Sequence, residues 1–305
     1  MIWALLLIGV MVLGLAEPFL RELRKPSVRA FEDEAPGAFA ELSAGRVHYR
    51  WSGQAVASVD GPVMVLVHGL TTPSFMWDAL EAPLVAKGYR VLRYDLYGRG
   101  YSDRPRGAQD AAFFVTQLEE LLAHEGITGP VTLVGYSMGG AIGTAFAAKH
   151  PVKVSRLVLL APAGMGHALG AAERLVALPG LVAEWLMLWM FPARFRAGVN
   201  AERDDPRVPD AVVAGQLAQL QRRGYLRSVL ESLRGILSED RAAEHRAIAA
   251  AGLPVLAVWG QVDETIPIAA KAVLEQWNGA AEHVVLGDAG HALPYTHAAE
   301  VADAI

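Results

Sequence analysis

Three residues of this sequence have side chains suited to nucleophilic attack on an acyl group: Ser137, Asp263 and His291. Ser137 is the centre of a G-x-S-x-G pattern, residues 135–139, which follows an apolar run and precedes a helical pattern. In a tight strand-to-helix turn, the flanking glycines keep side chains out of the crowded space, and the hydroxyl is presented at a helix N-terminus. Such a serine needs a base, a carboxylate that orients the base, and an oxyanion hole.

Loops after two later strands carry the partners that Ser137 would need. The apolar strand 255–260 leads into Asp263, and the strand 284–286 leads into His291. Ligands of open α/β sheets bind outside the carboxyl ends of the strands, so we expect both side chains at the edge where Ser137 lies. The rivals for the two roles are Glu264, Asp288, His245, His283 and His297.

We favour Asp263 and His291 over these rivals because of where each residue falls. Asp288 precedes His291 by three residues on the same loop, a poor position from which to orient it. His283 lies inside a predicted strand and His297 inside the last predicted helix, whereas His291 is flanked by small residues on a loop. Asp263 has a structural alternative, because it could simply cap the helix that begins near residue 268.

The oxyanion hole requires two backbone N–H groups. One is expected from Met138, directly after the serine, and the second from Leu70, in the loop that follows the buried strand 63–67. His68 and Gly69 precede Leu70 and would aim its amide into the site. We interpret His68 as a residue that shapes this loop, rather than as a proton acceptor.

Five motifs in this order make the sequence resemble the serine-type α/β-hydrolases, which are esterase-like or lipase-like and carry a helical cap. The motifs are His68-Gly69, residues 95–102 (DLYGRGYS), residues 135–140 (GYSMGG), residues 259–263 (WGQVD) and Gly290-His291. The chain order of serine, acid and histidine is that of the same family. The resemblance covers roughly residues 45–305. It implies a mostly parallel central sheet with helices on both faces and an inserted helical cap.

The resemblance also implies a role for each residue. Ser137 would attack the acyl carbon, His291 would take and return the proton, and Asp263 would orient His291. The amides of Leu70 and Met138 would hold the oxyanion, and water would release the acid. No metal ion or organic cofactor is implied.

A serine at the elbow excludes some relatives on this fold. Haloalkane dehalogenases and epoxide hydrolases resemble this pattern but use aspartate there, since alkylation must give an ester that water can later cleave. The sequence therefore favours acyl chemistry, with carboxylic esters of apolar acyl groups as the leading substrate class. A carbon–carbon bond hydrolase and a cofactor-free perhydrolase with the same triad are alternatives, and a non-catalytic, membrane-anchored binding protein is a minor one.

The alternation of strands and helices divides the chain, because it stops after the strand 156–161 and resumes at residue 254. The predicted segments are a hydrophobic stretch (1–20), a linker (21–44), the first part of the core (45–162), a helical cap (163–250) and the second part of the core (251–305). The cap is expected to decide the substrate. Candidate substrate contacts are Trp77, Tyr136, Trp185 and Trp189. The apolar stretch 185–191 could line an acyl pocket, touch a membrane, or simply pack on the core.

Residues 1–16 contain no charged side chain, and basic residues follow from Arg21. One interpretation is a signal anchor that keeps the catalytic domain on the cytoplasmic side, with membrane association through residues 1–20. A second is a cleaved signal peptide of a secreted or periplasmic protein. A third is an apolar helix docked on the folded domain.

Composition narrows the partners further. The chain of 305 residues carries a net charge of −5, which gives no indication of nucleic-acid binding. It contains no cysteine, which excludes disulfides, thiol nucleophiles and thiolate metal sites. A small ester or lipid-like molecule is the expected partner.

Overall fold

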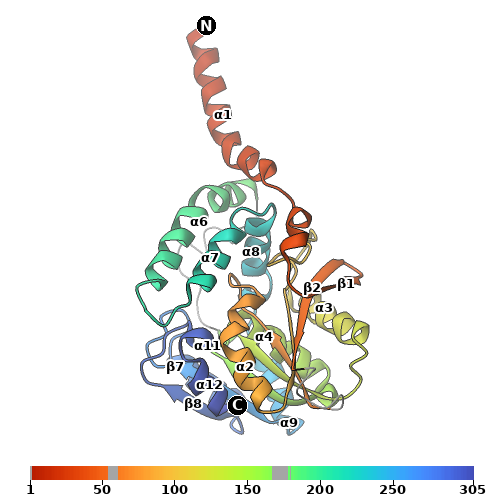
Figure 1. Ribbon diagram of the computed structural model, residues 1–305. Helices are drawn as coiled ribbons and strands as arrows, with labels where there is room; N and C mark the ends of the chain where they lie inside the picture. Colours follow the sequence, from red (N-terminus) through yellow and green to blue (C-terminus); the bar gives the residue numbers. More distant parts are fainter. Residues whose placement is uncertain (1, 54–60, 167–177, 179) are drawn as a thin grey trace.

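The computed structural model describes residues 2–53, 61–166, 178 and 180–305, without the side chains of residues 2 and 4–12. An eight-stranded sheet forms its centre, in the order β1-β2-β4-β3-β5-β6-β7-β8 (Figure 1). The strands are β1 (Ala38–Leu42), β2 (Gly45–Ser52), β3 (Val63–Val67), β4 (Arg90–Tyr94), β5 (Val131–Tyr136), β6 (Val154–Leu160), β7 (Val255–Gly260) and β8 (Glu282–Leu286).

The direction of the strands determines where a site can form. β1 pairs antiparallel with β2, and β2 antiparallel with β4, whereas the strands from β4 to β8 along the sheet are parallel. β5 and β7 are buried along their whole length, as their continuous apolar sequences predict for strands covered on both faces. The carboxyl ends of β3, β5, β7 and β8 therefore share one edge of the sheet.

Helices cover both faces of the sheet. The helices described are α1 (Ile2–Arg24), α2 (Asp78–Ala86), α3 (Ala111–His124), α4 (Met138–Lys149), α6 (Leu181–Glu202), α7 (Asp210–Gln219), α8 (Tyr225–Arg234), α9 (Ala242–Ala250), α10 (Ala269–Trp277), α11 (Leu293–Thr296) and α12 (Ala298–Ala304). Short 3-10 helices are η1 (Val28–Glu34), η2 (Ser74–Trp77), η3 (Pro151–Lys153) and η4 (Ile236–Ser238). One buried cluster joins the sheet to α3, α4, α9 and α10, and another joins it to α2, α11 and α12.

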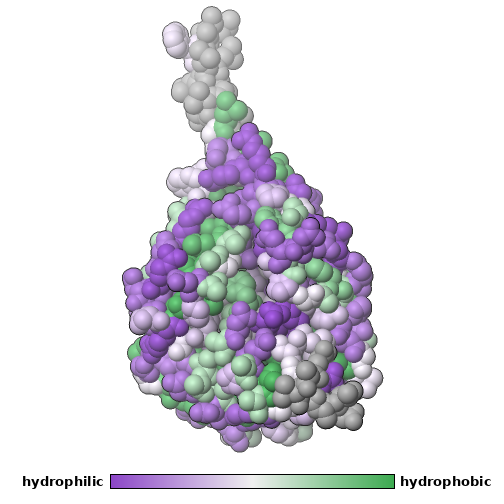
Figure 2. Space-filling model, in the orientation of Figure 1, coloured by the Kyte–Doolittle hydropathy of each residue, from purple (hydrophilic) through white to green (hydrophobic). Residues whose placement is uncertain are grey.

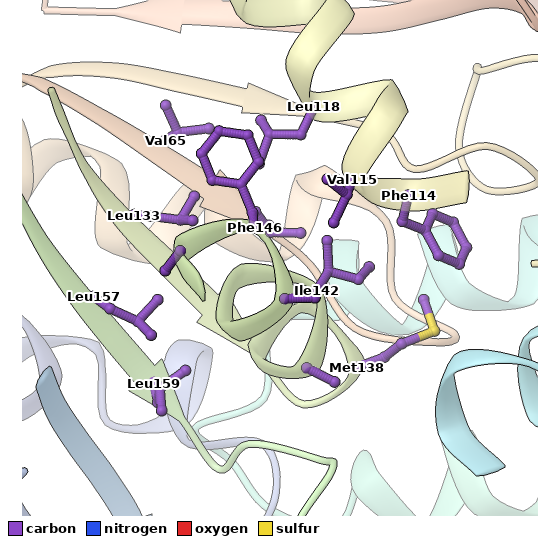
Figure 3. Packing of buried hydrophobic residues seen from close by; sticks show 14 of the residues in the cluster. Val65, Phe114, Val115, Leu118, Leu133, Met138, Ile142, Phe146, Leu157 and Leu159 are labelled. Atoms are coloured by element: carbon purple, nitrogen blue, oxygen red, sulfur yellow. The ribbon is translucent and has the colours of Figure 1, made fainter. Parts of the chain in front are cut away.

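Figure 3 shows how the first cluster holds α4 in place. Ile142 and Phe146 of α4 lie between Leu133 of β5 and Leu118 of α3, and all four side chains are fully buried. Burying a side chain of this size contributes about 1.5–3 kcal/mol, so α4 is firmly fixed against β5. The turn between β5 and α4, which carries Ser137, is fixed with it.

The helices α6, α7 and α8, called the cap helices from here on, follow β6 in the chain and lie together at one end of the molecule (Figure 1). Met187, Tyr225 and Leu226 belong to their own buried cluster, which Leu70 of the core also contacts. α9 falls within the segment predicted as cap, but it packs against α4 and α10 of the core. This part of the predicted cap boundary is wrong, because a helical pattern does not tell which layer a helix joins.

The prediction of a linker over residues 21–44 is also wrong in part. Residues 38–42 form β1, an edge strand in antiparallel register with β2, in which Ala40 pairs with Val47. Residues 28–34 form η1, and Glu32 pairs with Arg46 of β2. This stretch is rich in charged residues because it lies at an exposed edge of the sheet. Within β1, Ala40 is the one buried residue.

The N-terminal stretch is helical over Ile2–Arg24 and projects away from the rest of the protein (Figure 1). Within the described part of the chain, we find no helix with the length and apolar character needed to cross a membrane. The prediction of a membrane anchor rests largely on side chains 2 and 4–12, which lie outside that part.

Candidate active site

Ser137 lies in a strained turn between β5 and α4, with φ 52° and ψ −118°. A residue other than glycine rarely adopts such a conformation, and it persists only where the surroundings enforce it. The surroundings here are very close. A Cβ at Gly135 would collide with the carbonyl of Gly139, and a Cβ at Gly139 would collide with the carbonyl of Val67. The two glycines of the motif are thus required by close backbone contacts, as the sequence predicted.

His291 lies between the serine and the carboxylate. Its Nε2 is 3.0 Å from Ser137 Oγ, and its Nδ1 is 2.8 Å from Asp263 Oδ2. The second carboxylate oxygen, Asp263 Oδ1, accepts hydrogen bonds from the amides of Thr265 and Ile266, both at 2.8 Å. The carboxylate is fully buried, while 23% of the His291 side chain is exposed. Asp263 is therefore held rigidly, and His291 remains accessible.

The rival residues are engaged elsewhere or exposed. Asp288 pairs with Arg207 and with His297, and the ring of His283 accepts a hydrogen bond from the indole of Trp259. His245 is buried in α9 without a hydrogen-bond partner among the described residues, and its pKa is lowered to about 4 by burial and by Arg241. Glu264 is exposed.

His68 fixes the peptide that carries the Leu70 amide. The amide of Leu96 donates to His68 Nε2 at 2.9 Å, so Nδ1 carries the proton and donates to the carbonyl of Gly69 at 2.8 Å. In a trans peptide the N–H points opposite to the C=O, so this bond also sets the direction of the Leu70 N–H. Burial lowers the pKa of His68 to about 4, which keeps the imidazole neutral.

The Leu70 loop and the elbow lie against each other. A Cβ at Gly69 would lie 3.3 Å from Ser137 Cβ, so the backbone before Leu70 passes directly beside the serine. Met138 is the first residue of α4, a position whose amide has no acceptor within the helix. Gly69, which precedes Leu70, and Met138 are thus both close to Ser137.

Asp95 ties together the loop that follows β4. Its carboxylate contacts Nδ1 of His48 at 2.8 Å and accepts hydrogen bonds from the amides of Ser74 and Tyr101, both at 2.9 Å. Burial opposes ionisation, but His48 and the amide donors outweigh it and hold the pKa of Asp95 well below its usual range. Asp95 therefore has a structural role in this loop.

The four aromatic candidates lie in different surroundings. The Tyr136 ring is 5.1 Å from that of His291, so it forms a wall of the site. Trp77 is fully buried and packs edge-on against Tyr136 at 6.4 Å, which supports the site from the core. Trp185 and Trp189 stack on each other along α6 at 5.0 Å, and Trp189 is exposed.

A polar cluster beside the triad has no counterpart in the sequence predictions. Glu202, at the end of α6, accepts hydrogen bonds from Tyr295 Oη at 3.2 Å and from Gln216 Nε2 at 3.4 Å. Gln216 also donates to Thr72 Oγ1 at 2.9 Å, in the loop that carries Leu70. Burial raises the pKa of Glu202, and the nearby His291 opposes that shift. The four residues come from separate elements, so no sequence motif marks them.

Comparisons with known proteins agree with this geometry. The family model described as alpha/beta hydrolase fold matches residues 62–298. The chain belongs to the α/β-hydrolase family. The match includes Ser137, Asp263 and His291. Among the described residues of this α/β-hydrolase, no three His, Asp or Glu side chains are grouped so that they could hold a metal ion.

Several relatives of this α/β-hydrolase are known. An uncharacterized protein of Mycobacterium tuberculosis is 34% identical over 157 residues, which span 51% of this chain and only 44% of that protein. The 2-hydroxymuconate semialdehyde hydrolase of Pseudomonas sp. is 29% identical over 259 residues, 79% of this chain and 84% of that enzyme. The crystal structure of the enol-lactonase from Burkholderia xenovorans LB400 superposes with a TM-score of 0.72 and 24% identity, over 87% of this chain and 97% of that one. At this identity, the likeness concerns the fold.

Proposed function

We propose that this α/β-hydrolase is a serine hydrolase that cleaves carboxylic esters of apolar acyl groups through an acyl-enzyme intermediate. The observation that carries the proposal is the chain of contacts from Ser137 Oγ to His291 Nε2 at 3.0 Å and from His291 Nδ1 to Asp263 Oδ2 at 2.8 Å. These distances are within the reach of direct proton transfer between the serine and the imidazole.

The first half of the reaction forms the acyl-enzyme. Ser137 Oγ attacks the ester carbonyl carbon while His291 Nε2 takes the serine proton. The Nδ1–H of His291 donates to Asp263, which stabilises the imidazolium without itself taking the proton. The developing oxyanion accepts hydrogen bonds from the amides of Leu70 and Met138. The C–O bond to the leaving alkoxide then breaks, and His291 gives its proton to that oxygen.

The second half releases the acid by the same route in reverse. Water occupies the place of the departed alcohol, and His291 Nε2 takes one of its protons as its oxygen attacks the acyl carbon. The second tetrahedral intermediate collapses, the bond to Ser137 Oγ breaks, and His291 returns the proton to the serine. Apart from the ester and water, every group that takes part in these steps belongs to this chain.

A fluorophosphonate probe tests the proposal directly. It should label the folded wild-type protein at Ser137, and the Ser137→Ala variant should remain unlabelled while keeping its melting temperature within a few degrees. An exposed serine such as Ser43 provides the matched control, since Ser43→Ala should be labelled like the wild type. A folded wild type that resists the probe and every ester offered would refute the proposal.

A carbon–carbon bond hydrolase remains the second candidate. It is favoured by the likeness to 2-hydroxymuconate semialdehyde hydrolase, which extends over 79% of this chain. A panel of aryl and alkyl esters should be compared with vinylogous ring-cleavage diketones under the same conditions. Turnover of the diketones without turnover of any ester would replace the ester assignment by this one.

We also propose that α1 binds at a membrane surface, without requiring it to span the bilayer. Leu13, Leu15 and Leu23 of this helix are exposed, and Arg21 lies exposed beside them. Apolar and basic side chains on one projecting helix are typical of interfacial binding to anionic lipids. Flotation with vesicles containing phosphatidylserine should recover the full chain. Equal recovery of a chain lacking residues 1–20 would contradict this proposal.

A further inference from the structure

A cavity of about 470 Å³ lies between the end of α1, the loop after Asp103 and the cap helices α6 and α8. None of Ser137, Asp263 and His291 lines it, so it is separate from the candidate active site. Its volume is in the range of cavities that hold small organic molecules. The elements around it meet where α1 joins the body of the protein, and Figure 2 shows strongly hydrophilic residues gathered there beside hydrophobic ones.

One wall of the cavity is apolar. Phe19 and Leu23 come from α1, Met187 and Leu188 from α6, and Leu230 from α8. Met187 and Leu230 are also part of the buried cluster of the cap helices, so this wall is anchored in a packed interior. A hydrocarbon chain placed against this wall would remove its apolar surface from water, which favours binding.

The other side of the cavity carries more positive than negative charge. The charged lining residues are Glu22, Arg29, Asp103, Arg104, Arg106, Glu184, Arg223 and Arg227, which are five arginines and three acids. Two of the acids are already paired with two of the arginines. Asp103 lies 2.8 Å from Arg29, and Glu184 lies 3.6 Å from Arg227.

The third acid is paired as well, which leaves three arginines without an acid. Glu22 binds Lys25 at 2.6 Å and accepts the amide that precedes α8 at 2.7 Å. Among the described residues, no carboxylate pairs with Arg104, Arg106 or Arg223. Arg106 and Arg223 therefore have no paired carboxylate in the part of the chain that the structure describes, while Arg104 is attracted by Asp95 without a salt bridge to it.

Arg104 is the most constrained of the three. Its Nη1 and Nη2 donate to the carbonyls of Ser102 and Gly100, at 2.7 and 3.1 Å, and its Nε is buried without a partner within the described chain. Burial and the nearby Arg222 lower its pKa to about 9, so it is still charged at neutral pH. Asp95 attracts this charge, but Arg222 and Arg99 repel it, so an anion in the cavity would stabilise it further.

We propose that this cavity binds an amphiphile with an anionic headgroup and one apolar chain. The headgroup would lie among Arg104, Arg106 and Arg223, and the chain would lie along the wall formed by α1, α6 and α8. Carboxylate and phosphate headgroups share the chemistry that these guanidinium groups recognise. The ligand class is thus a fatty-acid anion or a monoalkyl phosphate.

Calorimetric titration of the full-length Ser137→Ala protein, below the critical micelle concentrations, tests this proposal. Laurate, dodecyl phosphate or both should bind with one-to-one stoichiometry. The ratio of their two dissociation constants identifies the preferred headgroup. Dodecanol lacks the charge, so it should bind at least about tenfold more weakly, which corresponds to ~1.4 kcal/mol of binding free energy. Acetate and inorganic phosphate should fail to bind, because they lack the chain.

The variant Arg106→Gln/Arg223→Gln separates this cavity from the candidate active site. Arg106 and Arg223 are both exposed, so folding should be preserved, and binding should weaken about tenfold. Arg246→Gln, which changes an exposed arginine of α9, should bind like the parent. Binding that is insensitive to Arg106→Gln/Arg223→Gln, equal binding of dodecanol, or no binding of either anion would overturn the proposal.

Discussion

Asp263 Oδ2 lies 2.8 Å from His291 Nδ1, although 28 residues separate them in the chain. The other carboxylate oxygen is held by two backbone amides, so the acid cannot turn away from the imidazole. This contact fixes both the orientation and the tautomer of His291. The Nδ1 proton is directed at Asp263, and Nε2 is left as an acceptor facing the Ser137 hydroxyl.

Replacing the carboxylate should therefore disable the base without unfolding the protein. In Asp263→Asn, an amide N–H can face Nδ1 and force the proton onto Nε2, and triads lose about 10⁴ in kcat from such a change. Steady-state kinetics on a p-nitrophenyl ester would measure it. Asp288→Asn is the control, because Asp288 pairs with Arg207 and His297 instead. Loss of activity in Asp288→Asn rather than in Asp263→Asn would contradict the assignment.

His68 should act on kcat through the Leu70 amide. In His68→Phe the hydrogen bond from Nδ1 to the Gly69 carbonyl is lost, and the amide is no longer held toward the site. The loss of one oxyanion donor costs about 10²–10³ in kcat. KM should change little, because the donor acts on the transition state. A variant of the exposed His124 is the control and should behave as wild type. If His68→Phe lowered the melting temperature but kept its kcat at low temperature, that result would contradict the positioning role.

Glu202 should make stability depend on pH. Its pKa is higher in the folded than in the unfolded protein, so the folded state binds the proton more tightly. This contribution favours folding at pH values below the unfolded pKa and is lost as the pH rises through the folded pKa. At neutral pH the partly buried charge is therefore destabilising.

Glu202→Gln should raise the melting temperature at pH 7.5 by ~2 °C, and the difference should vanish near pH 4. Glutamine keeps an acceptor for Tyr295, so the hydrogen bond is preserved. Scanning calorimetry at the two pH values measures the effect, with the exposed Glu300→Gln as control. A stabilisation that is equal at both pH values would show that burial of the charge is not its cause.

The elbow glycine should tolerate no side chain. In Gly139→Ala, the new Cβ would collide with the Val67 carbonyl, and overpacking of this kind costs about 1–3 kcal/mol or prevents folding. Gly198→Ala in α6 has open space around the same atom and should stabilise the helix by about 0.5–1 kcal/mol. Chemical denaturation would compare the two, and a Gly139→Ala protein as stable as wild type would mean that the turn can relax.

The fold and the proximity of Ser137, Asp263 and His291 could be predicted because each depends on local patterns. Continuous apolar runs such as residues 131–134 indicate buried parallel strands, and parallel strands bring their following loops to one edge. Ser137, Asp263 and His291 lie on three such loops, and their side chains meet within hydrogen-bonding distance. The outer elements were predicted less well, since β1 lies in the predicted linker and α9 packs on the core.

By itself, the sequence determined the elbow, the order of the triad residues and the sheet that brings them together, because glycine spacing and apolar periodicity act over a few residues. The tertiary structure alone decided what surrounds the triad. Glu202, Gln216 and Tyr295 come from three helices, α6, α7 and α11, and they meet only because the folded protein packs these helices together. The surplus of positive charge around the cavity between α1, α6 and α8 likewise arises from packing, since Asp103 pairs with Arg29 while Arg104 donates to backbone carbonyls.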